Sequence, residues 1–319
     1  MIFLYFFTKT AFFQNLFRIG GDICLKKGET MKSIKRILGT GCLLLTTSAV
    51  VAQSDFGVWS SVEGSTKLNK KLELSLEGEY RTQDMSTMTE RVSGAVNLSY
   101  KDKKIPFLKA DVGYTYMYMN YPSETEVKYR TDDEGNYEYD DEGHLIPKHK
   151  NVDAAYWTAR HRATASLTGS YKRGRFKFSL RERYQYTYRM AAECDRERWY
   201  YNPFHTITDS PEYYLDTDPE SEDYSYMTDE KKAKSDHKLR TRLQVSYDIK
   251  KCPFEPFAEI EIYNELDNAF ALDKVRYSVG TEYKINKKNK VKVYYRYQDY
   301  ADIDEVSGHV LGLGYAFEF

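Results

Sequence analysis

Nine lysine and arginine side chains on three consecutive segments are the residues of this chain best suited to act on a charged solute. The segments 155–171, 176–190 and 237–249 alternate between polar and apolar residues. Successive side chains of a strand point to opposite faces, so the basic residues of each segment share its polar face. We predict one basic wall, made by Arg160, Arg162, Lys177, Arg181, Arg183, Arg189, Lys238, Arg240 and Arg242.

The basic wall requires counter-charge, because neighbouring strands lie about 4.8 Å apart and buried, uncompensated charges cost several kcal/mol each. If water fills the space that the wall lines, mobile anions supply this charge and the protein is a narrow anion channel. If salt bridges fill it, the space is plugged. The sequence leaves both alternatives open. Inward carboxylates are expected on two other segments, as Glu73, Glu77 and Glu79 and as Glu259, Glu261 and Glu265.

A hydrolase of membrane lipids would require a histidine beside a serine or water nucleophile. No histidine has a serine two residues later or lies in a Gly-x-Ser-x-Gly turn. His161, His237 and His309 have the parity of the apolar residues, where an interfacial aromatic ring is the simpler interpretation. We therefore predict no enzyme, no catalytic residue and no cofactor, with an outer-membrane phospholipase or deacylase as the alternative. The six histidines are His144, His149, His161, His205, His237 and His309.

Acidic residues gather in two long stretches between alternating segments, 120–154 and 191–236. The first stretch contains Asp132-Asp133-Glu134-Gly135, which recurs eight residues later as Asp140-Asp141-Glu142-Gly143. Asp and Gly at such positions are typical of tight turns, so the repeat predicts a hairpin or paired turns. We interpret both stretches as long, acidic extracellular loops.

A calcium site is the alternative interpretation of the second acidic stretch. Asp216, Asp218, Glu220 and Glu222 alternate like the start of a calcium-binding loop. Ser221, however, stands where such a loop needs glycine, and Met227 where it needs a bidentate glutamate. A solvated loop is the simpler interpretation, and we expect no metal site.

The composition indicates where these side chains reside. The chain has 319 residues, with 47 basic and 48 acidic side chains, so its charge gives no indication of a nucleic-acid partner. It combines 41% apolar residues and 30 tyrosines with a mean hydropathy of −0.69. Apolar residues dispersed among charges are expected when one face of each strand meets lipid and the other a polar lumen.

Three features favour a membrane barrel over a soluble β-sandwich. The alternating segments are 11 to 17 residues long, whereas soluble strands average about 5–6 residues and tilted membrane strands need about 9–11. Tight connections alternate with long ones, as at the two surfaces of an outer membrane. Tyrosines gather where strands approach the long loops, as in an interfacial girdle.

Eleven alternating segments are present, but single-chain bacterial barrels have even strand numbers. We therefore predict an all-β, antiparallel transmembrane barrel of ten or twelve strands: either 56–67 does not span, or a twelfth strand lies in a long loop. The segments are 56–67, 71–82, 89–101, 107–119, 155–171, 176–190, 237–249, 254–265, 272–285, 290–300 and 308–319.

The first part of the chain predicts export. Lys32, Lys35 and Arg36 precede an apolar run that ends on small residues at Ala52, so 31–52 is expected to be a signal peptide and 53–319 the barrel. Residues 1–30 are interpreted as a mis-assigned upstream start. Cys194 and Cys252 are not expected to form a disulfide, because they flank opposite ends of a strand and lie too far apart.

Five stretches carry a family resemblance. They are Phe56-Gly57-Val58-Trp59, Leu76-Glu77-Gly78-Glu79-Tyr80-Arg81, Val275-Arg276-Tyr277 through Gly280-Thr281-Glu282-Tyr283-Lys284, Tyr294-Tyr295-Arg296-Tyr297-Gln298 and His309-Val310-Leu311-Gly312. These stretches resemble the family catalogued as domain of unknown function 2490, and they cover the exported chain except its two long loops. The resemblance implies a predicted outer-membrane barrel from Bacteroidota-like bacteria. It carries over no catalytic residue.

The sequence thus predicts an integral outer-membrane barrel of a Gram-negative bacterium. Its expected role is a narrow, porin-like channel or a structural and surface-interaction protein. Expected partners are outer-membrane lipids and lipopolysaccharide, and no nucleic acid. The closing Tyr315, Phe317 and Phe319 look like the terminal-strand signal that the outer-membrane assembly machinery reads. The oligomeric state and the solute are not predicted.

Overall fold

The computed structural model describes residues 55–201, 213–301 and 307–319. The expected signal peptide and upstream segment lie outside these residues, and the described regular elements are all strands. No helix among the described residues is long and apolar enough to cross a membrane.

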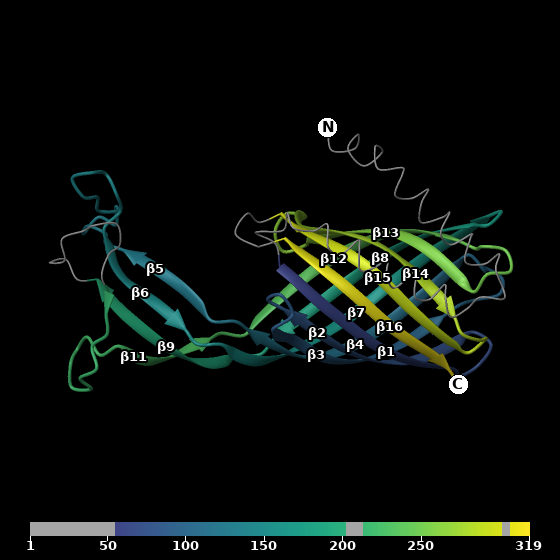
Figure 1. Ribbon diagram of the computed structural model, residues 1–319, viewed down its shortest axis with the longest axis horizontal. Coiled ribbons are helices and arrows are strands. Elements are labelled where there is room, and N and C mark those ends of the chain that lie inside the picture. The colour runs from purple at the N-terminus through teal and green to yellow at the C-terminus, as the bar shows by residue number, and fades with distance from the viewer. Residues whose placement is uncertain (1–54, 202–212, 302–306) are drawn as a thin grey trace, which may run out of the picture.

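Eleven of the strands form a closed barrel (Figure 1). Each long alternating segment of the sequence becomes one strand, because alternation gives it one apolar face and one polar face. The barrel strands are β1 (Asp55–Lys67), β2 (Leu72–Gln83), β3 (Met88–Tyr100), β4 (Leu108–Tyr121), β7 (Tyr156–Arg173), β8 (Phe176–Arg189), β12 (Lys234–Tyr247), β13 (Phe254–Glu265), β14 (Ala271–Lys284), β15 (Asn289–Tyr300) and β16 (Gly308–Glu318).

The prediction of ten or twelve antiparallel strands is wrong. All eleven barrel segments take part, and β1 pairs with β16 in parallel, from Asp55 opposite Gly308 to Ser65 opposite Glu318. An odd number of up-and-down strands brings the first and last strands together in the same direction, so the barrel closes on a parallel pair. The even-number rule, which describes most single-chain bacterial barrels, does not hold for this chain.

Two ends of the barrel are distinguished by their connections. One, here called the inner end, carries tight turns and the C-terminal residue Phe319, whose amide donates to the Ser65 carbonyl at 2.9 Å. Asn69 caps the β1–β2 turn by accepting hydrogen bonds from the amides of Lys71 and Leu72. The other, here called the outer end, carries both long connections and the beginning of β1 at Asp55.

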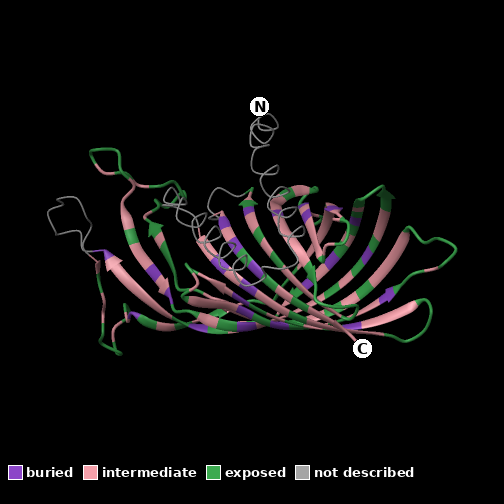
Figure 2. Ribbon diagram, turned by 45° about the vertical axis from the view of Figure 1, so that its right-hand side comes forward, coloured by how far each residue is buried: buried purple, intermediate pink, exposed green. Residues whose placement is uncertain are grey.

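The outside of the barrel is apolar. Leu76, Val112 and Leu180 are 60%, 55% and 50% exposed, and exposed residues alternate with more buried ones along the barrel strands (Figure 2). Soluble monomers rarely expose contiguous apolar patches of more than a few hundred Å². The polar residues between them face the lumen.

The two long connections are not simple loops. They form a second, five-stranded sheet, the surface sheet, that projects beyond the outer end of the barrel (Figure 1). Its order is β10-β9-β6-β5, and β11 also pairs with β9. Its strands are β5 (Glu124–Tyr129), β6 (Pro147–Asp153), β9 (Ala192–Tyr201), β10 (Tyr213–Tyr214) and β11 (Tyr226–Lys231).

The repeat in the first connection forms paired turns, as its sequence predicts. The carboxylates of Asp132 and Asp140 each accept two backbone hydrogen bonds from within their own turn. Gly135 and Gly143 follow with φ angles of 87° and 84°, a left-handed conformation that favours glycine. The acidic side chains of this repeat therefore shape turns at the tip of the surface sheet.

Candidate functional site

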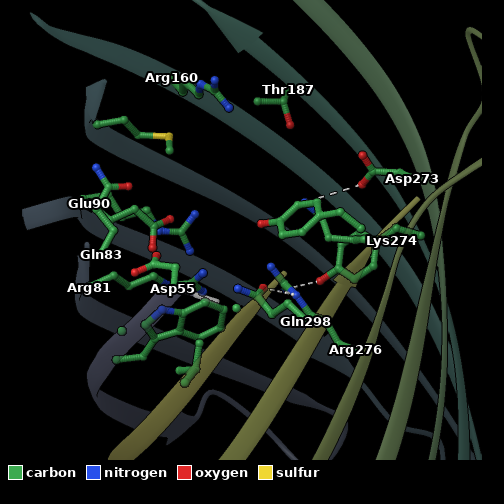
Figure 3. Close-up of a pocket in the computed structure, with 18 of the residues that line it drawn as sticks. Asp55, Arg81, Gln83, Glu90, Arg160, Thr187, Asp273, Lys274, Arg276 and Gln298 are labelled. Carbon is green, nitrogen blue, oxygen red and sulfur yellow. Dashed lines mark hydrogen bonds and ion pairs between the residues drawn. The ribbon is translucent and has the colours of Figure 1, made fainter. Parts of the chain in front are cut away.

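A cavity of about 730 Å³ opens inside the outer end of the barrel. Figure 3 shows its lining side chains converging from several strands, with Arg160, Arg81 and Arg276 on three of its sides. We call this cavity the outer vestibule. Its volume is within the range of about 300–1,000 Å³ that is usual for small-ligand sites.

The basic wall is built by three adjacent strands, since β7 pairs with β8 and β8 with β12. Their register sets arginines directly opposite one another, with Arg160 facing Arg189. Arg183 likewise faces Arg240, and Arg181 faces Arg242. Like charges directly opposite destabilise a pair of strands. Other groups must therefore hold these arginines in place.

Two buried glutamates of β13 hold part of the wall. Glu261 accepts hydrogen bonds from Arg181 at 2.8 Å and from Arg240 at 3.0 Å, and its side chain is 2% exposed. Glu259 pairs with Arg242 at 3.4 Å and with Arg296 at 3.2 Å. The expected inward carboxylates of this strand therefore lie beside the wall. The remaining paired residue of the wall is Lys238, which contacts Asp273 and Glu265.

Five residues of the basic wall make no ion pair with any described residue. Lys177 is exposed at the inner end. Arg189 donates to the Lys232 carbonyl, and Arg162 donates to the Thr187 hydroxyl at 3.4 Å. Arg160 lies 5.1 Å from the centroid of the Tyr121 ring. The fifth is Arg183. Arg160 and Arg162 line the outer vestibule.

The opposite side of the vestibule is also basic, which the sequence analysis did not single out. Arg81 stacks on Trp59, 3.4 Å from its ring centroid, and both Arg81 and Arg91 bind Glu79. Arg276 donates to Gln298 at 2.7 Å and to the Tyr263 hydroxyl, and no described carboxylate pairs with it. The alternation of polar and apolar residues in 71–82, 89–101 and 272–285 could have placed these arginines on the lumen face.

Positive charge is in excess around the vestibule. Eight lysine and arginine residues line it, against the four carboxylates of Asp55, Glu90, Asp236 and Asp273. Glu79 and Glu261, which bind three of the arginines from outside the cavity lining, reduce the excess to two positive charges. The lining cations are Arg81, Arg91, Arg160, Arg162, Lys238, Arg240, Lys274 and Arg276.

Buried polar atoms without protein partners gather at the same cavity. Among the described residues, they include the Nε atoms of Arg160 and Arg240, the hydroxyl of Tyr121, Gln83 Nε2 and Asn120 Oδ1. Native proteins leave few buried polar atoms unsatisfied, so such a concentration indicates bound water or a ligand. Excess positive charge around a cavity attracts anions more than cations.

A second cavity, of about 290 Å³, opens at the inner end. Four cations line it, namely Lys101, Lys109, Lys177 and Arg242, together with serine and threonine hydroxyls and no carboxylate. It shares no lining residue with the outer vestibule. Between the two cavities lies a layer, here called the waist, that contains Arg181, Glu259 and Glu261.

The surface sheet holds a separate ionic cluster. Asp153 accepts hydrogen bonds from Arg196 and Lys231, and the Arg196 hydrogen bond lowers the pKa of Asp153 to about 2. Burial raises the pKa of the adjacent Cys194. Asp153, Cys194 and Asp229 are the described residues close enough to share a metal ion. Because Arg196 and Lys231 already bind both carboxylates, the cluster is self-neutralised.

The structure also places the cysteines, the suggested calcium loop and the C-terminal aromatic residues that were predicted from the sequence. Cys194 carries a free thiol, as expected if it does not pair with Cys252. In the suggested calcium loop, Asp216 instead accepts hydrogen bonds from the Asp218 amide and the Ser221 hydroxyl. Tyr315 of β16 and Phe319, which follows the strand, are exposed, and the Phe317 and Phe319 rings meet edge to face. His205 lies outside the described residues.

Comparisons with known proteins place the chain in a family. No curated protein matches it. Among solved structures, it is similar to the β domain of the Bordetella autotransporter BrkA, with a TM-score of 0.43 and 9% identity over 79% of this chain and 86% of that chain. The family model described as protein of unknown function DUF2490 matches residues 56–305. Because that match covers more than half of the sequence, the chain belongs to the DUF2490 family.

Proposed function

We propose that this protein is an integral outer-membrane barrel of a Gram-negative bacterium that binds small anions in its outer vestibule and passes them through a narrow lumen. The observation that carries the proposal is the pair of basic cavities along one lumen, the outer of which contains arginines that form no ion pair with any described residue. Removing such charges from water without compensation costs several kcal/mol each. An anionic solute in the vestibule supplies the missing charge.

The membrane location is supported by the outside of the barrel, where leucine, valine and tyrosine side chains are widely exposed. A closed barrel leaves no strand edge unpaired. Closed barrels and α-helices are the two structures that can span a bilayer, because their backbone groups are all hydrogen-bonded internally. The proposal includes export through a cleaved signal peptide over 31–52 and recognition of Tyr315, Phe317 and Phe319 by the assembly machinery. Lipopolysaccharide would surround the outer end.

The test is the ion preference of the purified protein in a planar bilayer under a salt gradient. We expect wild type to prefer anions. Arg160→Gln combined with Arg162→Gln should move the reversal potential towards that of a non-selective pore, because both charges face the vestibule and neither is needed by a carboxylate. Arg181 and Arg240 are less suitable positions, since their loss would also disrupt Glu261.

A matched control is Arg173→Gln combined with Arg175→Gln, which removes two exposed charges from the β7–β8 turn. The control should leave the reversal potential near that of wild type. A wild-type preference for cations, or one that the vestibule variant leaves unchanged, contradicts the proposal. If the wild type carries no measurable current, transport through the lumen is ruled out and only anion binding in the vestibule still stands.

A surface-interaction role is the second candidate, and the five-stranded surface sheet favours it because it projects beyond the barrel. The lipid-hydrolase alternative gains little support, since Nδ1 of His161, His237 and His309 binds tyrosine hydroxyls instead of serine. Mass analysis of the lipids from a deletion strain tests that alternative. An altered acyl composition would favour the enzyme.

A further inference from the structure

The outside of the barrel carries one tyrosine–histidine arrangement three times. In each copy, a strand presents Tyr-x-Tyr on its apolar face and the neighbouring strand presents a histidine directly opposite the second tyrosine. The register pairs are Tyr116 with His161, Tyr186 with His237 and Tyr297 with His309. Three repeats on different strands indicate a common role.

The contacts within the three copies are the same. The first tyrosine of each motif forms a hydrogen bond with Nδ1 of the histidine, at 2.6 Å for Tyr114 and His161 and 2.6 Å for Tyr184 and His237. Tyr295 and His309 form the third. The second tyrosine packs its ring on the imidazole, with ring centroids 5.4, 4.9 and 5.1 Å apart. Each imidazole is therefore held on two sides.

The three histidines occur towards the outer end of the barrel. The strands β7, β12 and β16 all run from the outer end to the inner end, and His161, His237 and His309 lie in the first third of their strands. All three side chains are partly exposed, and each contacts a tyrosine of the apolar outside. His309, the second residue of β16, also borders the outer vestibule. In a membrane this position meets the headgroup region, where amphipathic rings are enriched.

The direction of the hydrogen bond at Nδ1 determines whether the other ring nitrogen, Nε2, donates or accepts. A tyrosine hydroxyl that donates to Nδ1 leaves the imidazole proton on Nε2. Among the described residues, no hydrogen bond to Nε2 of these three histidines is formed. A donor at the membrane interface then requires an acceptor from outside the protein, and phosphate oxygens are strong acceptors.

We propose that the three tyrosine–histidine pairs bind the phosphate groups of lipids around the outer end of the barrel, with Nε2–H as the donor. The inference rests on the proposed membrane location. It goes beyond the aromatic girdle, because the rings of a girdle only need an amphipathic surface, whereas here hydroxyl and imidazole are arranged so that one nitrogen remains available. The barrel is thereby fixed to phosphate-bearing lipids at three points.

The test is native mass spectrometry of the full barrel in detergent micelles containing either phosphatidylglycerol or a diacylglycerol with the same acyl chains. The variant His161→Phe/His237→Phe/His309→Phe keeps the aromatic rings but removes all three donors. A hydrogen bond to a charged acceptor corresponds to roughly a tenfold change in affinity. We expect phosphatidylglycerol to bind the variant about tenfold more weakly at each site, and diacylglycerol to bind both proteins equally.

The matched control is Tyr118→Phe/Tyr171→Phe/Tyr283→Phe, which removes three exposed hydroxyls outside the pairs; it should retain wild-type binding of phosphatidylglycerol. Equal binding by wild type and the histidine variant overturns the inference, and so does equal binding of the two lipids by wild type. If the variant fails to fold, ¹⁵N spectra of wild type decide instead, because the Nε2 signals must shift with phosphatidylglycerol and not with diacylglycerol. A wild type that inserts into neither kind of micelle contradicts the membrane location itself.

Discussion

Replacing Glu261 with glutamine should destabilise the barrel by about 3–5 kcal/mol, the usual cost of leaving one side of a buried ion pair without its partner. Glu261 is 2% exposed and accepts hydrogen bonds from Arg181, Arg240 and the Tyr263 hydroxyl. Glutamine keeps the size of the side chain but removes the charge. Arg181 of the waist and Arg240 of the outer vestibule then lose their carboxylate. Urea titration of the protein folded in vesicles measures the difference.

The matched control is Glu318→Gln, the same chemical change in an exposed pair with Lys67 at the inner end. Exposed pairs contribute about 0–1 kcal/mol, so this variant should remain close to wild type. Glu261→Gln combined with Arg181→Met should recover part of the loss, because one unpaired charge is removed. If Glu261→Gln proves as stable as Glu318→Gln, the waist is not held by this glutamate.

Replacing Gly312 with valine should prevent β16 from closing the barrel normally. Tyr294 of β15 lies directly between Gly280 of β14 and Gly312 of β16. A Cβ atom at Gly312 would lie 2.0 Å from Cζ of the Tyr294 ring, which therefore would have to leave its place. Overpacking of this kind costs about 1–3 kcal/mol or more. The fraction of heat-modifiable, folded protein should fall clearly.

Two further variants test whether the effect of Gly312→Val comes from the clash with Tyr294. Gly78→Val is the matched control, because a Cβ atom at Gly78 meets nothing within 4 Å. Tyr294→Ala in the Gly312→Val background should restore folding, since it removes the ring that the valine meets. Normal folding of Gly312→Val alone would show that the ring does not occupy this position.

Local patterns explain which parts of this fold follow from the sequence. Every barrel strand coincides with an alternating segment, because a lipid face and a lumen face impose a period of two on each strand. The number of strands was mispredicted, since alternation identifies strands but not how the first and last of them pair. The surface sheet was not predicted because β5, β6, β10 and β11 are short. Several of their partners come from distant parts of the chain, as β6 pairs with β9.

The candidate site was predictable only in part. The alternation of polar and apolar residues along their strand places Arg160 and Arg162 on its polar face, whichever strands pair with it. Which carboxylate meets which arginine depends on the stagger between strands, which no single segment encodes. Glu261 thus comes to lie beside Arg181 and Arg240, while Arg160 and Arg162 pair with no carboxylate in the described part of the chain. Trp59 meets Arg276 of β14 and Arg296 of β15 through the closure of β1 on β16, and alternation within single segments does not predict that closure.

The most direct test of the central claim, that the outer vestibule is an anion site, is anomalous diffraction from crystals equilibrated with rubidium bromide, in which both ions can be identified. We predict bromide within hydrogen-bonding distance of the Arg160 and Arg162 guanidinium groups, and no rubidium in the vestibule. Rubidium in the vestibule, or bromide confined to the outer surface of the protein, would contradict the claim.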